Sequence, residues 1–313
     1  MSTIVIFGMN RNFFGAQIVQ IPYLQKLRSA HPDQKIILFS KNSLSKLFLD
    51  LKLVDEVILN KGYGFTYNYL RSHSIYATIN FRDKSKLLEI IQVFTKATYK
   101  LGFKNLFTKL FFTHTYTNDI EVYRALNLLY LVKPLLGESF SQDLFLTSFK
   151  PQSSTLNISL FPGAGDAYKL WDIQNYLQVA QNLSNHYDQE VIIHLFIGNN
   201  EDHLTDPFIQ DKSLKTVIHK NKPITEILSL LSQSILSIGN DTGPMHCAQL
   251  SNVNALVLFS HELEKGERVV KEWFYSRDKA RYLLSEPYTS INTIKVTQVT
   301  KSSIELIDQE IVS

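Results

Sequence analysis

Short apolar runs of strand type alternate with segments of helical spacing along most of the sequence, and this alternation limits the fold more than any other feature. In the first half, the runs are separated by longer segments whose apolar residues recur every three or four positions. Strands that alternate with helices of this length are typical of parallel βαβ units. The expected strands are Thr3–Phe7, Lys35–Phe39, Glu56–Leu59 and Tyr76–Asn80, and the expected helices are residues 18–27, Ser43–Leu51 and Lys84–Phe94.

The alternation lapses over residues 147–157, whose sequence TSFKPQSSTLN is polar and contains a proline, and then restarts. We therefore expect an α/β chain of two Rossmann-like domains, residues 1–151 and 152–313. The final helix could pack within its own domain or back on the N-terminal domain. The expected strands of the second half are Ile158–Phe161, Val191–Ile197, Ile235–Ile238 and Ala255–Phe259, and its helices are Ile173–Leu183, Pro223–Ser232, Pro244–Leu250 and Ser302–Val312.

The two halves differ in charge, although the whole chain carries a formal net charge of only +3. Residues 1–150 contain 19 Lys and Arg against 10 Asp and Glu, a net charge of +9. Residues 151–313 contain 13 Lys and Arg against 19 Asp and Glu, a net charge of −6. We expect the halves to meet different partners, with an anionic partner at the first.

Several classes of protein are excluded by what the sequence lacks. The single cysteine, Cys247, rules out an intramolecular disulfide and a cysteine-rich zinc site, and we interpret it as a buried apolar residue. The first residues do not have the pattern of a secretory signal, and no stretch approaches the ~20 apolar residues of a membrane span. No nucleic-acid-binding motif is present, so we expect no nucleic-acid partner. We expect a cytoplasmic protein, either free or bound peripherally at the inner face of the cytoplasmic membrane.

The segment SIGNDTGPMH, residues 237–246, leads from an expected strand into an expected helix. Asp241 or Thr242 can cap that helix, Gly243 leaves its backbone uncrowded, and the following proline suits its first turn. Free backbone N–H groups and the helix dipole at such a start attract an anion, and His246 is near enough in sequence to donate to a phosphate. The alternative is an ordinary capped helix with a solvated histidine.

Two further loops follow strands of the second half, at the sheet edge where α/β domains bind ligands. After Phe161, small residues that include Gly163 permit a ligand to approach the backbone, and Lys169 supplies a positive charge. The spacing matches neither a P-loop nor a dinucleotide fingerprint, and a tight turn with a surface lysine is the alternative. After Ile197, Asn200 or Glu201 could accept hydrogen bonds from a ribose or base, or belong to a solvated loop.

Together these segments resemble glycosyltransferase family 9, the lipopolysaccharide heptosyltransferase family. The resemblance rests on Pro162-Gly163-Ala164, Lys169-x-Trp171, Gly198 with Glu201, and the run from Asn240 to His246. It implies a GT-B fold, in which two Rossmann-like domains face a central cleft, and an inverting transfer that needs no metal or other cofactor. The implied donor is an ADP-linked sugar, by default heptose, and the implied acceptor is the lipopolysaccharide core or another anionic glycolipid or glycan.

The resemblance also assigns donor-site roles. Lys169 and the backbone at Asp241, Thr242 and Gly243 would hold the diphosphate, with His246 as a further donor, and Gly163 would leave room for the nucleotide. Either Glu201 or Asn200 would lie near the nucleoside. The sequence departs from the family after Phe259, where SHELEKGE, residues 260–267, replaces a loop rich in glycine and proline.

The first half departs from the family at Ala16. Residues 14–22, FGAQIVQIP, resemble the family's first loop and helix, but the family has an aspartate where this chain has Ala16. That aspartate is the family's presumed general base, and alanine cannot accept a proton. Three interpretations remain: a substitute base, a reaction driven by the good leaving group, or nucleotide-sugar binding without turnover. Asp83 is the first candidate for a substitute base, followed by His114 and Asp119.

The stretch from Ile91 to Tyr116 is basic and aromatic and contains no acidic residue. Lys96, Lys100 and Lys104 are four residues apart, so a helix would place them on one face. Such a face suits an anionic membrane or an acceptor that carries carboxylates or phosphates. The alternative is a solvated lysine face over buried aromatic side chains.

Two classes of function fit these observations. The favoured one is a glycosyltransferase, with another sugar or a capsule, glycan or protein acceptor as a variant. The other is a scaffold protein that keeps a nucleotide-sugar site without turnover.

Overall fold

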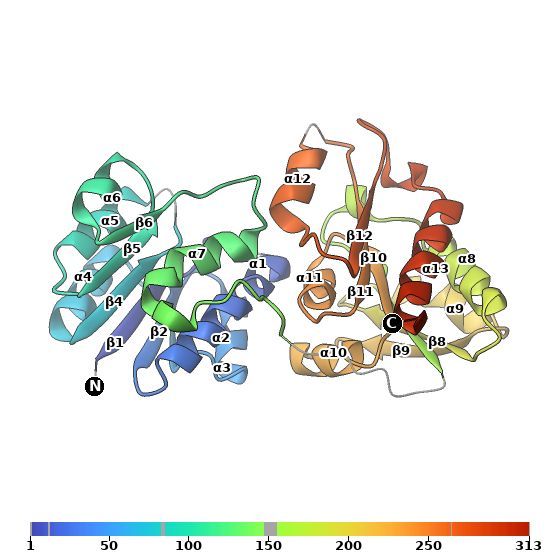
Figure 1. Cartoon of the computed structure of the whole chain (residues 1–313), viewed down its shortest axis with the longest axis horizontal. Coiled ribbons are helices and arrows are strands. Elements are labelled where there is room, and N and C mark those ends of the chain that lie inside the picture. The colour runs from blue at the N-terminus through green and yellow to red at the C-terminus, as the bar shows by residue number, and fades with distance from the viewer. Residues whose placement is uncertain (1, 12, 83–84, 147–154, 264, 313) are drawn as a thin grey trace. The chain divides into compact units, whose positions relative to one another are not determined.

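The computed structural model describes residues 2–11, 13–82, 85–146, 155–263 and 265–312. The chain divides into two compact units, Met1–Leu144 and Phe145–Ser313 (Figure 1). Most of the expected linker at 147–157 lies outside the described residues. Among the described residues, no helix is both long enough and apolar enough to cross a membrane.

The first unit is built on a parallel six-stranded sheet of order β3-β2-β1-β4-β5-β6. Its direction of winding reverses between β1 and β4, and ligands bind at the carboxyl ends of strands at such a switch point. The strands are β1 (Thr3–Phe7), β2 (Lys35–Ser40), β3 (Glu56–Leu59), β4 (Ile75–Asn80), β5 (Tyr99–Phe103) and β6 (His114–Tyr116). The helices are α1 (Phe14–Ile18), α2 (Ile21–Ala30), α3 (Leu47–Asp50), α4 (Tyr63–Ser72), α5 (Lys86–Val93), α6 (Leu106–Phe111) and α7 (Arg124–Leu136).

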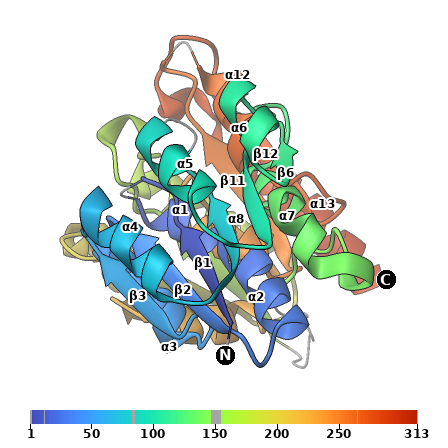
Figure 2. The same cartoon turned by 90° about the vertical axis from the view of Figure 1, so that its left-hand side faces the viewer.

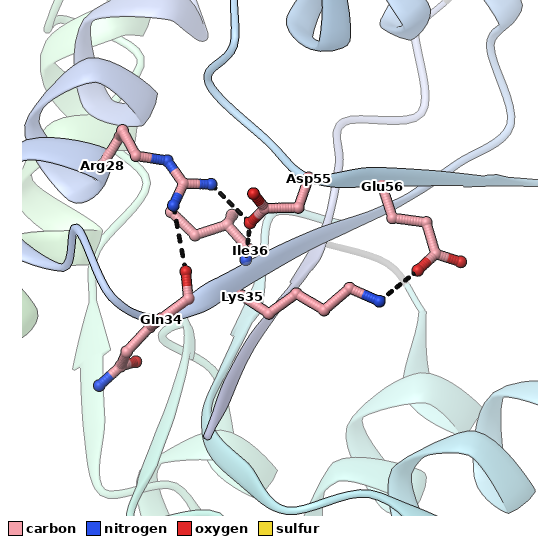
Figure 3. Close-up of polar contacts among 6 residues, drawn as sticks. All are labelled: Arg28, Gln34, Lys35, Ile36, Asp55 and Glu56. Atoms are coloured by element: carbon pink, nitrogen blue, oxygen red, sulfur yellow. Dashed lines mark hydrogen bonds and ion pairs between the residues drawn. The ribbon is translucent and has the colours of Figure 1, made fainter. Parts of the chain in front are cut away.

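The opposite, amino-terminal edge of this sheet is fixed by a polar cluster around Asp55 (Figure 3). The Asp55 carboxylate accepts hydrogen bonds from Arg28 Nη2 at 2.6 Å and from the Ile36 amide at 2.7 Å. Burial alone raises the pKa of Asp55, but these two donors outweigh it, and the pKa is lowered. The cluster therefore attaches the end of α2 to the starts of β2 and β3.

The second unit has the same architecture, with a parallel sheet of order β12-β11-β10-β7-β8-β9. Its switch point lies between β7 and β10. The strands are β7 (Leu156–Phe161), β8 (Val191–Ile197), β9 (Lys215–Lys220), β10 (Leu236–Asn240), β11 (Asn254–Phe259) and β12 (Ala280–Leu284). The helices are α8 (Ile173–His186), α9 (Asp206–Gln210), α10 (Ile224–Leu231), α11 (Gly243–Gln249), α12 (Gly266–Trp273) and α13 (Val296–Val312).

The core of the second unit lies between its sheet and the helices α8 and α13. Inward side chains of the central strands pack there against Trp171 and Tyr176, which are both buried. The Trp171 indole N–H donates to Ile294 O at 3.0 Å, which satisfies the buried donor. The final helix α13 packs on α8 within this unit (Figure 1).

The expected α/β class is confirmed, and β1, β3 and β8 have the predicted bounds. The expected helical row of lysines is not formed. Lys100 lies in β5, where the side-chain period is two rather than 3.6 residues, and its ammonium group donates to Val93 O at 2.8 Å. Lys96 and Lys104 lie outside helices on either side of this strand. Cys247 is fully buried, as expected.

Candidate functional site

The loops after β7 and β10 meet at the switch point of the second unit, where Asn240 joins them. Asn240 is fully buried, and its amide nitrogen donates to Pro162 O at 2.7 Å. Its amide oxygen accepts from the Tyr176 hydroxyl at 3.0 Å, which adds α8 to the same junction. Because all of these groups are buried and paired, the two loops are held in one geometry.

Lys169 and Asp241 form an ion pair across this junction. Lys169 ends a 3₁₀ turn at Ala167–Lys169, and its ammonium nitrogen lies 2.7 Å from Asp241 Oδ2. Burial alone lowers the pKa of Lys169, but the Asp241 carboxylate outweighs it and raises this pKa. The lysine side chain is 22% exposed and the aspartate side chain 9%, so the lysine is the more accessible partner.

Thr242 and Gly243 begin the helix α11 beside this ion pair. Thr242 has the extended backbone of an N-cap residue, but its side chain caps no helix N–H. Its hydroxyl oxygen is buried and has no hydrogen-bond partner among the residues that the structure describes. An unpaired buried hydroxyl is costly, and here it lies in the segment predicted to meet the ligand.

The carboxylate of Glu201 lies across the ends of β7 and β8. Glu201 Oε2 accepts from the Gly198 amide at 2.7 Å. A Cβ added to Gly163 would stand only 2.2 Å from Glu201 Oε1, so a larger residue at 163 would displace the Glu201 carboxylate from this position. Asn200 adopts a left-handed turn with φ of 66° and has no comparable contact in the described structure. The structure therefore brings Glu201, rather than Asn200, to the sheet edge.

His246 lies behind the ion pair and is 3% exposed, so the alternative of a solvated histidine is wrong. Its Nε2 is 4.0 Å from Asp241 Oδ1, and its ring lies 5.5 Å from the ring of Trp273. Burial lowers the pKa of His246 to about 4, against the opposing effect of Asp241. The imidazole is therefore neutral near pH 7 and able to donate one hydrogen bond.

The first unit has a basic pocket of about 330 Å³ at the carboxyl ends of β1, β2 and β4. Arg82 forms part of its wall, and its guanidinium donates to Gly8 O at 3.1 Å and Phe39 O at 2.9 Å. Burial lowers the pKa of Arg82, so a nearby anion would stabilise its charged form. No described acidic residue lines this pocket. Its lining residues are Met9, Asn10, Arg11, Lys41, Tyr63, Phe81, Arg82, Ser85 and Arg124.

The predicted residues of the first half that the structure describes do not line this pocket. Ala16 is buried in α1. Asp83 lies outside the described residues. His114 begins β6, at the opposite edge of the sheet from the pocket, whereas Asp119 follows β6 at the same edge. The predicted Lys96, Lys100 and Lys104 do not line the pocket.

Sequence reasoning missed the four cations of the pocket, which are Arg11, Lys41, Arg82 and Arg124. Arg11, Lys41 and Arg82 follow strands β1, β2 and β4. Because ligands bind at the carboxyl ends of parallel strands, a search for cations just after the predicted strands could have found them. Across the described parts of both units, no group of three His, Cys, Asp or Glu side chains is placed to hold a metal ion.

A family model described as glycosyltransferase family 9 (heptosyltransferase) matches residues 90–265, more than half of the 313 residues. No curated protein is a significant match. A glycosyl transferase family 9 structure from Veillonella parvula DSM 2008 is 16% identical with a TM-score of 0.72, and the match covers 99% of this chain and 98% of that one. E. coli ADP-heptose lps heptosyltransferase II is 16% identical with a TM-score of 0.66, and 99% of each chain is covered.

A third solved structure, E. coli heptosyltransferase WaaC with ADP, is 12% identical with a TM-score of 0.70. The match covers 98% of this chain and 100% of that one. WaaC has also been solved with ADP-2-deoxy-2-fluoro heptose. At these identities the likeness shows a shared fold.

The buried His246 predicts a pH dependence of stability. Its pKa of about 4 in the folded chain lies below the ordinary value of 6.5, so the unfolded chain binds the proton more readily. The free energy of unfolding should therefore fall as the pH drops from about 6.5 towards 4, by about 2 kcal/mol at pH 5 from this residue. Urea denaturation at pH 7.5 and pH 5 measures this change.

In His246→Gln, the loss of stability between the two pH values should be smaller than in the wild type by that amount. The exposed His203→Gln serves as the matched control and should leave the pH dependence unchanged. An unchanged pH dependence in His246→Gln would contradict a neutral, buried His246.

Proposed function

Since the chain belongs to glycosyltransferase family 9, we propose that it moves a sugar from a nucleotide-diphosphate donor to an anionic surface glycan. The default donor is ADP-heptose and the default acceptor is the lipopolysaccharide core. The observation that carries the proposal is the Lys169–Asp241 ion pair at the switch point of the second unit, with the Glu201 carboxylate at the neighbouring ends of β7 and β8. An ADP-linked donor is supported by the ligands named for the WaaC structures.

In the proposed donor complex, the Lys169 ammonium binds the diphosphate while it remains close to Asp241. The ion pair neutralises the aspartate, whose charge would otherwise repel the phosphates. The Thr242 hydroxyl and the Gly243 amide are further donors beside it, and the neutral His246 supports the same loop. The carboxylate of Glu201 accepts hydrogen bonds from the ribose hydroxyls, since it lies at the neighbouring strand ends.

The proposed reaction is a single inverting displacement. The acceptor hydroxyl attacks the anomeric carbon on the face opposite the diphosphate, and the bond from that carbon to the leaving oxygen breaks. The diphosphate departs with the electron pair, and Lys169 stabilises the developing charge. The proton of the hydroxyl passes to a base. This scheme uses no metal or other cofactor.

The acceptor is proposed to bind the first unit through the basic pocket. Four cationic side chains and no described acid line it, so it favours a phosphate or carboxylate on the acceptor. Because a nucleotide sugar is made in the cytoplasm and the default acceptor is a glycolipid, we place the protein in the cytoplasm, peripherally at the membrane's inner face.

The general base is the point at which this chain departs from its family. Ala16 is buried and cannot take the proton, and among the described candidates Asp119 follows β6 at the pocket edge. Asp83 remains the first candidate from its place after β4. Loss of a positioned base typically costs ~10²–10⁴-fold in rate, which slows a transferase without abolishing it. The alternative is a nucleotide-sugar-binding scaffold without turnover, which Ala16 in the place of the family's presumed base would favour.

Calorimetry with ADP tests the donor site. Lys169→Ala should weaken ADP binding by roughly 10–100-fold, because it removes a charge-assisted hydrogen bond to phosphate. Lys215→Ala is the matched control, since Lys215 is also ion-paired in this unit but lies on the edge strand β9. Equal affinity in the wild type and Lys169→Ala would contradict the assigned phosphate site.

A transfer assay with ADP-heptose and a lipopolysaccharide-core acceptor separates turnover from binding. If Asp83 or Asp119 is the base, its change to Asn should lower kcat ~10²–10⁴-fold with little change in ADP affinity. Exposed Asp50→Asn serves as the control and should keep wild-type kcat. Tight ADP binding without any wild-type transfer would instead support the scaffold alternative.

A further inference from the structure

The outward face of α5 is apolar although it is exposed. Leu87, Ile90 and Phe94 follow an i, i+3, i+7 spacing and are 47%, 41% and 68% exposed. Leu88 and Ile91, on the other face of the helix, are buried in the core of the first unit. The helix therefore has apolar side chains on both faces, and packing within the unit accounts for only one of them.

The helix α6 repeats this pattern. Leu106 and Leu110 lie one turn apart and are 82% and 70% exposed, and Phe111 beside them is 50% exposed. The start of the helix is fixed by a capping box, in which the Thr108 amide donates to Asn105 Oδ1 at 2.9 Å and the Asn105 amide donates to Thr108 Oγ1 at 2.9 Å. The capped helix therefore displays its leucines to solvent in a fixed orientation.

Both helices cover the same face of the sheet. The strands β4, β5 and β6 are neighbours in that order, and α5 and α6 form the two connections between them. Both connections run in the same direction across the sheet. Because such connections are right-handed, both helices lie on the same side of the sheet. Figures 1 and 2 show α5 and α6 beside each other, and Asn105 Nδ2 donates to Glu89 Oε1 at 3.0 Å between them. We call their outward side chains the apolar helix face.

The charge around the apolar helix face has one sign. Lys86, Lys96, Lys104 and Lys109 are exposed, and the last three form no ion pair within the described structure. Glu89 is the one acidic residue in the sequence from 85 to 112, and it is 4% exposed and hydrogen-bonded to Asn105. The exposed charges of this region are therefore all positive.

We propose that the apolar helix face docks on an anionic lipid bilayer. Monomeric soluble proteins rarely expose so many large apolar side chains in adjacent elements, and those that do use them for binding. Leucine, isoleucine and phenylalanine side chains on short helices suit the boundary between headgroups and acyl chains, and lysines around them complement anionic phospholipids. Charge complementarity thus selects an anionic bilayer as the occupant.

The position of the apolar helix face gives docking a consequence for the basic pocket. Ser85, the residue before α5, lines that pocket, so the helix that carries Leu87 and Ile90 begins at the pocket's rim. A lipid-anchored acceptor in the same bilayer would then be held near the pocket. Docking itself does not depend on the proposed transferase reaction, and its test uses no sugar donor.

Co-sedimentation of the full chain with vesicles tests the proposal. The wild type should bind phosphatidylcholine vesicles that contain phosphatidylglycerol and bind pure phosphatidylcholine vesicles much more weakly. The double variant Leu106→Ser/Leu110→Ser should lower the partition coefficient roughly tenfold or more, since it removes the two most exposed anchors. Lys104→Gln/Lys109→Gln should lower it roughly 30-fold, from about 1 kcal/mol for each lysine.

Matched controls lie outside the apolar helix face. Ile209→Ser changes an apolar residue of α9 that is 50% exposed, and Lys46→Gln/Lys52→Gln removes two exposed lysines near α3. Both variants should bind like the wild type. All of these substitutions are at exposed positions, so the fold should be kept, and circular dichroism checks that it is.

Three results would overturn the proposal. The first is wild-type binding that does not depend on phosphatidylglycerol or does not occur. The second is unchanged binding of Leu106→Ser/Leu110→Ser, which would mean that lysines alone hold the protein to the surface. The third is a lipid-free dimer in sedimentation velocity that the same leucine variant dissociates, which would assign the apolar helix face to a second copy of the chain.

Discussion

The buried amide of Asn240 is the contact on which the proposed donor site depends. It hydrogen-bonds Pro162 after β7 and the Tyr176 hydroxyl on α8, and its own strand leads directly to Asp241. Because it is fully buried, every one of these bonds is formed in a region that excludes water. The Lys169–Asp241 ion pair spans the same two loops, and the Asn240 hydrogen bonds hold those loops together. Glu201 extends the same edge to β8 through the Gly198 amide.

The two units use charge differently, and this explains the contrast between the net charges of the two halves. In the second unit, where acidic residues outnumber basic ones, a single lysine is balanced by an aspartate at the proposed diphosphate site. In the first unit, four cations line the basic pocket without a described acid, and four exposed lysines surround the apolar helix face. In the proposed function, individually placed hydrogen-bond donors bind a small nucleotide in the second unit, and the positive field of the first unit attracts a large anionic surface.

Much of the fold could be predicted because the inner strands are mainly apolar runs, as in β1 and β8. Strand β5 is not predicted because Lys100 in its sequence, YKLGF, lies four residues from both Lys96 and Lys104. This spacing also fits one face of a helix, and the local sequence does not distinguish the two. The edge strands β9 and β12 are partly exposed and carry charged residues, so their sequence signal is weak. At the proposed donor site, the motifs predict Lys169 and Asp241, whereas only the turn geometry after β8 shows that the Glu201 carboxylate lies at the sheet edge. The basic pocket joins residues 11, 41, 82 and 124, which only the sheet order brings together.

The central claim is that one nucleotide-sugar site is formed where β7, β8 and β10 end in the second unit. A crystal structure of the protein with ADP tests this claim most directly. The account predicts diphosphate oxygens within hydrogen-bond distance of the Lys169 ammonium and ribose hydroxyls on the Glu201 carboxylate. ADP bound elsewhere, or bound at this edge with Lys169 and Glu201 in contact with neither group, would contradict it.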